Sequence, residues 1–305
     1  MRCNSKEEFF KALKYATVYT STVSLYPTSS QRTNIVISRN RRIGISLSGI
    51  ADWFSHYGNA KCVRWLREGY KVVKECNRIT NEEAGVPPSI RITCVKPSGT
   101  ISQLVGCSPG MHHPTSTYAI RRIIIDKLHP IVPLLIEANY KYEPQIEYVK
   151  GTDIEGRMIM SQYLNNSSIG DFLPVESNTS YVFEFPMYLG KSRPANTVSA
   201  WEQFSQLAML QREWADNSVS CTIYFNPETE SDQLDKMLAQ FAPMVKSVSM
   251  LPLKDHSIYP QVPYQEVNEE EYKLRVSELK PIDWAKYHGS DGQNELYCSN
   301  DTCSI

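Results

Sequence analysis

The sequence predicts an α/β protein, because segments with strand patterns alternate along the chain with segments that have helix patterns. Two predicted strands are clear: residues 90–95 and 218–225 are rich in β-branched residues, and a proline follows each within two residues. The predicted helices repeat apolar residues every three or four positions, which gives a helix one apolar face. With 305 residues, the chain is long enough for one large domain or two smaller ones.

Two amphipathic helices are predicted in the first part of the chain. Residues 5–25 carry apolar side chains at roughly helical spacing, at least over their first half, and residues 59–82 do so throughout. Cys62 and Cys76 fall on the apolar pattern of the second helix, so we interpret them as buried thiols rather than ligands. Residues 43–50 fit either a strand or a helix that packs closely on a neighbour through its small residues.

The rest of the chain continues the alternation, apart from the polar residues 150–180, which we interpret as a loop or an insertion. Further strands are predicted at residues 118–125 and 181–186. Further helices are predicted at residues 127–139, 199–214, 231–247 and 269–279.

Composition excludes several classes of protein. The net charge of −1 argues against a nucleic-acid polymer or a membrane surface as partner. No apolar run approaches the roughly 18 residues of a membrane span, and the first residues do not resemble a signal peptide. Eight cysteines in this length are too few for a disulfide scaffold, so we expect reduced thiols and a cytoplasmic protein.

The segment that follows the strand at 90–95 has a composition suited to binding phosphate. Pro97 ends the strand, and Ser98, Gly99 and Thr100 follow it. Hydroxyls beside a glycine favour a tight turn with free backbone N–H groups, which is what a phosphate needs. An ordinary Pro-Ser-Gly turn is the alternative interpretation.

Other polar motifs have simpler interpretations. His112 and His113 are adjacent and lack a third ligand at useful spacing, so we predict no metal site. The arginine pairs at 41–42 and 121–122 could bind phosphate, but salt bridges at the ends of strands and helices are the favoured interpretation.

Two cysteines flank the Pro-Ser-Gly turn. Cys94 and Cys107 could form a redox pair, but Cys94 follows the apolar face of its strand, which favours packing in the core. Downstream, Trp214, Asp216 and Asn217 end a helix next to a strand, and we interpret them as packing and capping residues.

Taken in order, the motifs resemble the catalytic subunit of ribonucleotide reductases, in the adenosylcobalamin-dependent (class II) form that reduces ribonucleoside triphosphates. The matching segments are residues 39–46, 96–102, 110–114, 120–122, 214–220 and 259–264, together with the tail cysteines Cys298 and Cys303. They cover most of the chain.

The resemblance implies an α/β fold, namely the C-terminal portion of a ten-stranded α/β barrel over residues 1–285, and a flexible redox tail over residues 286–305. It implies 2′-deoxygenation of ribonucleotides by a cysteine thiyl radical, generated by homolysis of the Co–C bond of adenosylcobalamin. The substrate phosphates would be held by Pro97, Ser98, Gly99, Thr100 and Ile101.

The resemblance also gives the tail a role. Cys298 and Cys303 would reduce the active-site disulfide again and would then be reduced by thioredoxin. Thiol–disulfide exchange needs an exposed thiolate and a second thiol that resolves the mixed disulfide, and four intervening residues allow both. Two incidental thiols on a frayed chain end are the alternative interpretation.

The sequence departs from the family in one respect that bears on activity. The radical cysteine of the family lies in an Asn-Pro-Cys-x-Glu type of motif, which this sequence lacks. That motif, the acid/base glutamate and the two redox cysteines that face the substrate would all precede Met1. We therefore expect a C-terminal or split-gene fragment that is inactive without an N-terminal part and, with open strand edges, poorly soluble alone. A non-catalytic remnant that binds nucleotides or a partner, and a fragment of a class I large subunit, are the alternatives.

Overall fold

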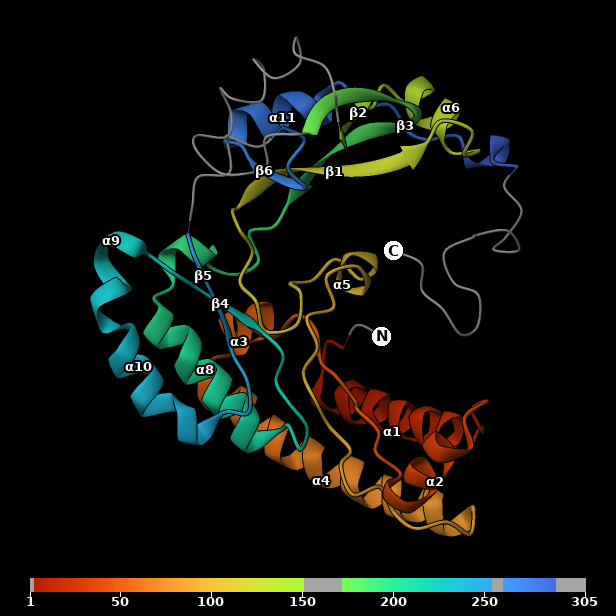
Figure 1. Cartoon of the computed structure of the whole chain (residues 1–305), viewed down its shortest axis with the longest axis vertical. Coiled ribbons are helices and arrows are strands. Elements are labelled where there is room, and N and C mark those ends of the chain that lie inside the picture. Colours follow the sequence, from red (N-terminus) through yellow and green to blue (C-terminus); the bar gives the residue numbers. More distant parts are fainter. Residues whose placement is uncertain (1–2, 151–171, 254–259, 289–305) are drawn as a thin grey trace. The chain divides into compact units, whose positions relative to one another are not determined.

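The chain forms two compact units, which are described separately (Figure 1). The residues that the computed structural model describes are 3–150, 172–253 and 260–288. The units comprise Met1–Thr117 with Leu189–Lys254 (unit 1) and Tyr118–Tyr188 with Asp255–Ile305 (unit 2). Each unit is thus built from two separate stretches of the chain. The sequence-based division at residue 286 stays a prediction.

Unit 1 carries the long helices. Its helices are α1 (Lys6–Val23), α2 (Gln31–Asn40), α3 (Ile50–Tyr57), α4 (Asn59–Glu83), α5 (Ile101–Leu104), α8 (Ala200–Glu213), α9 (Pro227–Glu230) and α10 (Leu234–Phe241). Short 3-10 turns lie at Ala195–Thr197, Ser231–Gln233 and Ala242–Met244. The predicted helices at 5–25, 59–82 and 199–214 are therefore confirmed, and the one at 231–247 is shorter than predicted. No described helix is both long enough and apolar enough to cross a membrane.

Helix α2 was not expected, because it has no buried residue and hence no apolar face that the sequence could reveal. A local polar contact defines its start instead: the side chain of Ser30 accepts a hydrogen bond from the backbone N–H of Thr33. At its other end, Arg41 adopts a left-handed conformation with φ 48° and stops the helix.

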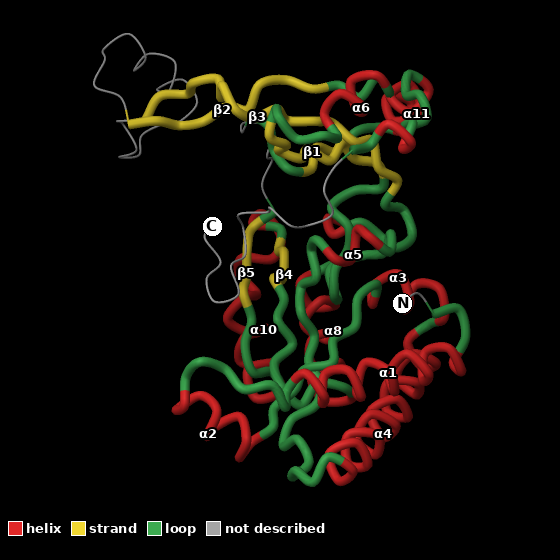
Figure 2. Tube along the Cα trace, turned by 90° about the vertical axis from the view of Figure 1, so that its right-hand side faces the viewer, coloured by secondary structure: helices red, strands yellow, loops and turns green. Residues whose placement is uncertain are grey.

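Extended segments of unit 1 lie parallel to one another. Ile45 bridges to Thr93, and Val95 bridges to Val219, in both cases in parallel. Next along the chain, β4 (Thr222–Phe225) pairs in parallel with β5 (Ser249–Pro252), and the two strands lie side by side in Figure 2. Because helices join these parallel segments, the predicted α/β class is confirmed for unit 1.

A polar cluster at the end of α8 ties the parallel segments together. Trp214 is fully buried, and its indole N–H donates to the carbonyl oxygen of Cys94 at 3.0 Å. The carboxylate of Asp216 accepts from the backbone N–H of Ile92, while the Asn217 amide donates to two backbone carbonyl oxygens on neighbouring segments. The predicted packing role is confirmed for Trp214, whereas the side chains of Asp216 and Asn217 join neighbouring segments rather than cap α8.

Unit 2 is an antiparallel sheet. Its strands run in the order β2 (Tyr142–Lys150), β3 (Phe172–Tyr188), β1 (Tyr118–Asp126) and β6 (Tyr264–Glu266), and its helices are α6 (Val132–Glu137) and α11 (Glu269–Ser277), with a 3-10 turn at Trp284–Lys286. The predicted loop at 150–180 is wrong for residues 172–180, which extend β3, whereas 151–171 lie outside the described residues. Cross-strand pairing, which is non-local, overrides the polar composition of this part of β3.

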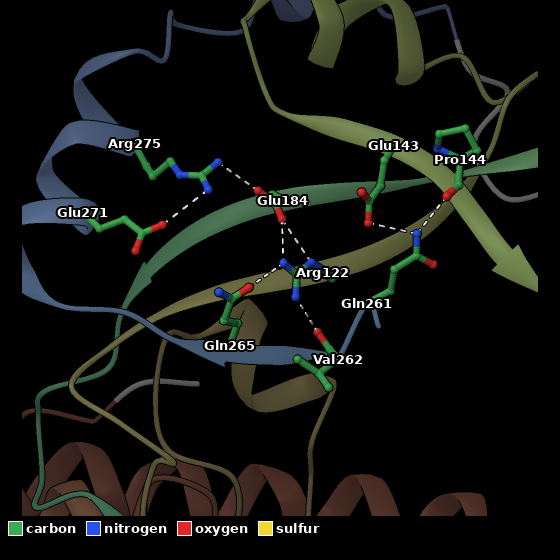
Figure 3. Close-up of polar contacts among 9 residues, drawn as sticks. All are labelled: Arg122, Glu143, Pro144, Glu184, Gln261, Val262, Gln265, Glu271 and Arg275. Carbon is green, nitrogen blue, oxygen red and sulfur yellow. Dashed lines mark hydrogen bonds and ion pairs between the residues drawn. The ribbon is translucent and has the colours of Figure 1, made fainter. Parts of the chain in front are cut away.

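Ion pairs hold α11 to the sheet of unit 2 (Figure 3). Glu184 on β3 accepts from Arg122 on β1 at 2.8 Å and from Arg275 on α11 at 2.9 Å. Arg275 also reaches Glu271, and Arg122 also donates to the side chain of Gln265. These contacts confirm the salt-bridge interpretation for Arg122.

Candidate functional site

The Pro-Ser-Gly turn of unit 1 begins where an extended segment ends. The backbone N–H of Lys96 donates to the hydroxyl of Ser46 at 2.8 Å, on the segment beside it. Two residues later, Ser98 has φ 53°, a left-handed conformation that is uncommon for residues other than glycine. The chain therefore turns sharply at the position where the sequence places the phosphate-binding loop, residues 96–102.

The side chain of Ser98 is held from two directions. Its hydroxyl oxygen accepts a hydrogen bond from the backbone N–H of Gly110 at 2.9 Å and from the hydroxyl of Ser48 at 2.7 Å. The carbonyl oxygen of Ser98 also accepts from the N–H of Ser102, which closes the first turn of α5. The loop is thus fixed in shape by its own atoms and by two neighbouring segments.

Three adjacent backbone N–H groups of this loop point to no acceptor. Over the described part of the chain, the N–H groups of Gly99, Thr100 and Ile101 make no hydrogen bond, and all three residues are exposed. Consecutive N–H groups at a tight turn that opens a helical turn form a concave set of donors that fits an anion. The turn therefore lies at the residues that the sequence predicted, and their role in binding phosphate stays a prediction.

The close approach of a second segment explains a glycine in this site. A Cβ atom on Gly110 would lie 2.5 Å from the carbonyl oxygen of Lys96, and the residue has φ 54°. By contrast, a Cβ atom on Gly99 would meet nothing within 4 Å. Gly110 is therefore required by the fold, whereas the space above Gly99 is free for a ligand.

The two histidines beside this site have structural contacts. The Nδ1 atom of His112 lies 3.0 Å from the carbonyl oxygen of Pro109, and its Nε2 atom accepts from the backbone N–H of Thr222 at 3.0 Å. Because a backbone N–H can only donate, Nε2 carries no proton and Nδ1 is the protonated nitrogen. The ring of His113 contacts the carbonyl oxygen of Arg193. Within residues 3–150, 172–253 and 260–288, no group of three or more potential ligands could hold a metal ion.

The described cysteines of unit 1 differ in burial. Cys94 and Cys62 are buried, as predicted, while Cys76 is only partly buried. Burial raises the pKa of the Cys94 thiol, which disfavours the reactive thiolate. Cys298 and Cys303 lie outside the described residues, so their role stays a prediction.

Three of the four paired arginines, Arg41, Arg121 and Arg122, donate hydrogen bonds within their own unit. Arg41 is buried, and its guanidinium donates to Ser21, Ser24 and Asn81. All these acceptors are uncharged, so the predicted salt bridge is wrong for Arg41. Burial without a carboxylate partner lowers the pKa of Arg41 from its ordinary value. Arg121 donates to the carbonyl oxygen of Pro263 in unit 2.

The sequence did not indicate the residues that hold the loop and the segment after it in place through hydrogen bonds. Ser46 and Ser48 each bond to it, and the carboxylate of Asp52 accepts from the N–H of Ser108 at 2.7 Å. These residues lie about fifty positions before their partners. No spacing rule connects such distant positions, and the only local signal was a run of small residues.

Comparison with known proteins gives relatives for nearly the whole chain. No protein-family model matches. The chain is 38% identical to a probable adenosylcobalamin-dependent ribonucleoside-triphosphate reductase of Dictyostelium discoideum, over 99% of this chain and 36% of that protein. It is 33% identical to the adenosylcobalamin-dependent ribonucleoside-triphosphate reductase of Euglena gracilis, over 97% of this chain and 38% of that protein.

A solved structure matches as well. A crystal structure of a B12-dependent (class II) ribonucleotide reductase superposes with a TM-score of 0.77 at 27% identity, over 92% of this chain and 39% of that one. The chain therefore spans little more than a third of the length of these relatives. The resemblance that the motifs predicted is confirmed.

Proposed function

We propose that this relative of the adenosylcobalamin-dependent ribonucleoside-triphosphate reductases supplies the C-terminal part of such an enzyme, with residues 96–102 as the loop that binds the substrate phosphates. The enzyme would reduce ribonucleoside triphosphates to 2′-deoxyribonucleotides. The parallel segments of unit 1 would complete a ten-stranded α/β barrel with strands from an N-terminal part. That part would also contribute the radical cysteine, for which this sequence has no motif.

The observation that carries this proposal is the set of three exposed N–H groups at Gly99, Thr100 and Ile101, for which the described residues provide no acceptor. A triphosphate oxygen would accept from these groups and from the hydroxyl of Ser98. Pro97 would set the direction in which the chain enters the turn. The names of the relatives support the choice of nucleotide and of cofactor.

The cofactor brings its own cobalt and would supply the radical by homolysis of its Co–C bond. The described residues offer no cluster of ligands for a further metal ion. We assign none of them to adenosylcobalamin, and the role of the loop does not depend on how the cofactor is bound.

The tail would return reducing equivalents to the site. Each turnover removes the 2′-hydroxyl as water and oxidises two cysteine thiols to a disulfide. Cys298 or Cys303 would attack that disulfide as a thiolate, and the other tail thiol would resolve the mixed disulfide, leaving a tail disulfide that thioredoxin reduces.

The decisive experiment is reconstitution. The chain, a matching N-terminal part of a relative, adenosylcobalamin, a ribonucleoside triphosphate and thioredoxin should together form deoxyribonucleotide. We expect Cys298→Ser to abolish turnover with thioredoxin but to allow one turnover of pre-reduced enzyme. If an assembled pair forms no product, the chain is instead a non-catalytic remnant, the alternative that the missing cysteine motif favours.

A binding experiment tests the loop by itself. Gly99→Ala adds one methyl group where the fold leaves open space. We therefore expect unchanged stability but weaker binding of the nucleotide, by about tenfold or more, because the methyl group would take up open space next to the donors that a bound phosphate needs. Equal affinity of the variant and the original chain for ATP, measured by titration calorimetry, would remove the loop from the site.

A further inference from the structure

The hydrogen-bond donor and acceptor positions of the Ser98 hydroxyl can be assigned one by one. A serine hydroxyl offers one O–H donor and two acceptor lone pairs. The backbone N–H of Gly110 takes one lone pair at 2.9 Å, and the hydroxyl of Ser48 donates to the other at 2.7 Å. Both lone pairs are then engaged, and no described residue accepts from the Ser98 O–H. The O–H of the Ser98 side chain therefore remains available to donate a hydrogen bond to a ligand.

The backbone at Ser98 supports the same assignment. With φ 53° the residue is left-handed, which costs a residue with a Cβ atom roughly 1–2 kcal/mol. Strain of this kind persists where surrounding contacts hold it, and it concentrates at binding and catalytic sites. Here the contacts from Gly110 and Ser48 hold the side chain of the residue that directly precedes the open N–H groups of residues 99–101.

Ser48 lies on a segment that hydrogen-bonds to the chain both at the start of the loop and after its end. Before it, Ser46 accepts from the N–H of Lys96, and after it, Asp52 accepts from the N–H of Ser108. The N–H of Gly49 also donates to the carbonyl oxygen of Ser108 at 2.7 Å. These bonds fix the backbone around Ser48, so its hydroxyl is presented to Ser98 in a set position.

We propose that Ser48 is a positioning residue for substrate binding: by occupying one lone pair of the Ser98 hydroxyl, it turns the Ser98 O–H toward a phosphate oxygen of the nucleotide. This inference rests on the proposed function of the loop. Ser48 itself does not contact the substrate. Without its hydroxyl, the Ser98 O–H is free to rotate and to donate elsewhere, so part of its bond to the phosphate is lost.

The test is a double-mutant cycle on the full chain, with ATP and inorganic triphosphate as separate titrants in calorimetry. Ser48→Ala should weaken binding by about 2- to 10-fold, the value of one neutral hydrogen bond. Ser98→Ala should weaken it by about 10-fold or more, because this bond goes to a charged group. The double variant should bind within about twofold of Ser98→Ala alone, because Ser48 acts only through Ser98.

Two further variants, Ser48→Thr and Gly99→Ala, distinguish a failure of the role proposed for Ser48 from a failure of the loop as a binding site. Ser48→Thr keeps a hydroxyl and should restore the affinity to within about twofold of the original chain. If Ser48→Ala leaves the affinity unchanged, or weakens binding equally with and without Ser98, the positioning role is wrong while the loop keeps its function. If the original chain binds neither titrant, or if Gly99→Ala binds as well as it does, the proposed loop and this inference both fall.

Discussion

Two regions of the molecule carry groups that could bind an anion, the loop at residues 96–102 in unit 1 and the arginine cluster around Glu184 in unit 2. In the cluster, Arg122 and Arg275 both donate to the Glu184 carboxylate, and Arg122 also donates to Gln265 (Figure 3). In the loop, the three successive N–H groups at positions 99–101 find no acceptor among the described residues.

The comparison shows that charge is a poor guide to a binding site. The arginines are stronger donors than amide groups, but the protein has already satisfied them, and binding a ligand there would require breaking ion pairs whose side chains are only 13–22% exposed. The three open N–H groups of the loop carry no formal charge, yet a ligand would replace only water at them and would break no bond within the protein. On this reasoning, the proposed site would bind its ligand through open backbone donors, whereas the arginines serve to hold unit 2 together.

Among the variants that test this comparison, Gly110→Ala should cause the largest loss of stability. Gly110→Ala would place a Cβ atom 2.5 Å from the carbonyl oxygen of Lys96 at a residue with φ 54°. Steric overlap and left-handed strain together should destabilise the chain by about 2–5 kcal/mol. Urea unfolding would measure the loss, and binding of ATP should disappear with the shape of the loop.

The control for this variant is Gly99→Ala, which changes the same residue type eleven positions earlier. We expect a change in unfolding free energy of less than about 0.5 kcal/mol, since nothing lies within 4 Å of the added atom. Equal stabilities of the two variants would show that the loop does not depend on the close approach of Gly110 to Lys96.

A smaller loss of stability, without a change in nucleotide binding, is expected when the carboxylate of the arginine cluster around Glu184 is removed. Glu184→Ala leaves two guanidinium groups without their shared carboxylate, and because these groups are partly exposed the cost should be about 1–3 kcal/mol. Affinity for ATP should not change. The exposed pair Lys141–Glu278 provides the control, and Glu278→Ala should cost less than about 0.5 kcal/mol. A loss of nucleotide binding in Glu184→Ala would make the cluster part of the site.

The comparison also shows which features a sequence can reveal. Helices α4 and α8 were predictable because each buries apolar side chains at helical spacing, which is a local pattern. Helix α1 shows the same pattern more weakly: it buries Leu13 and packs the partly buried Phe9 and Phe10 against the core. Helix α2 has no buried residue and was missed. The polar composition of the start of β3 predicts a loop, whereas its strand structure comes from pairing with β2, which a local pattern does not show.

The same reasoning applies to the candidate site. The turn at 96–102 was predictable from its proline, glycine and hydroxyl residues. Its supports at Ser48 and Asp52 were not, because a hydroxyl or carboxylate gains its meaning only from the partner that the fold brings to it. For the histidine pair, the contacts with Pro109, Thr222 and Arg193 could not be predicted, because these partners lie on other segments or in a turn whose shape the sequence does not specify.

The smallest effect on the free energy of unfolding is expected for His112. We expect this residue to contribute to stability and not to ligand binding. Burial disfavours its charged form and lowers its pKa, whereas in the unfolded chain the pKa has its ordinary value of about 6.5. As the pH falls below that value, the unfolded state binds a proton first, so stability is complete above about pH 6.5 and declines on acidification. His112→Gln should reduce this decline between pH 7.5 and 5.5 in urea unfolding, although His113, whose pKa is also lowered by burial, should keep part of it. An equal decline in the variant would mean that folding does not lower the pKa of His112, and that the bond from Thr222 to the neutral ring does not contribute to the pH dependence of stability.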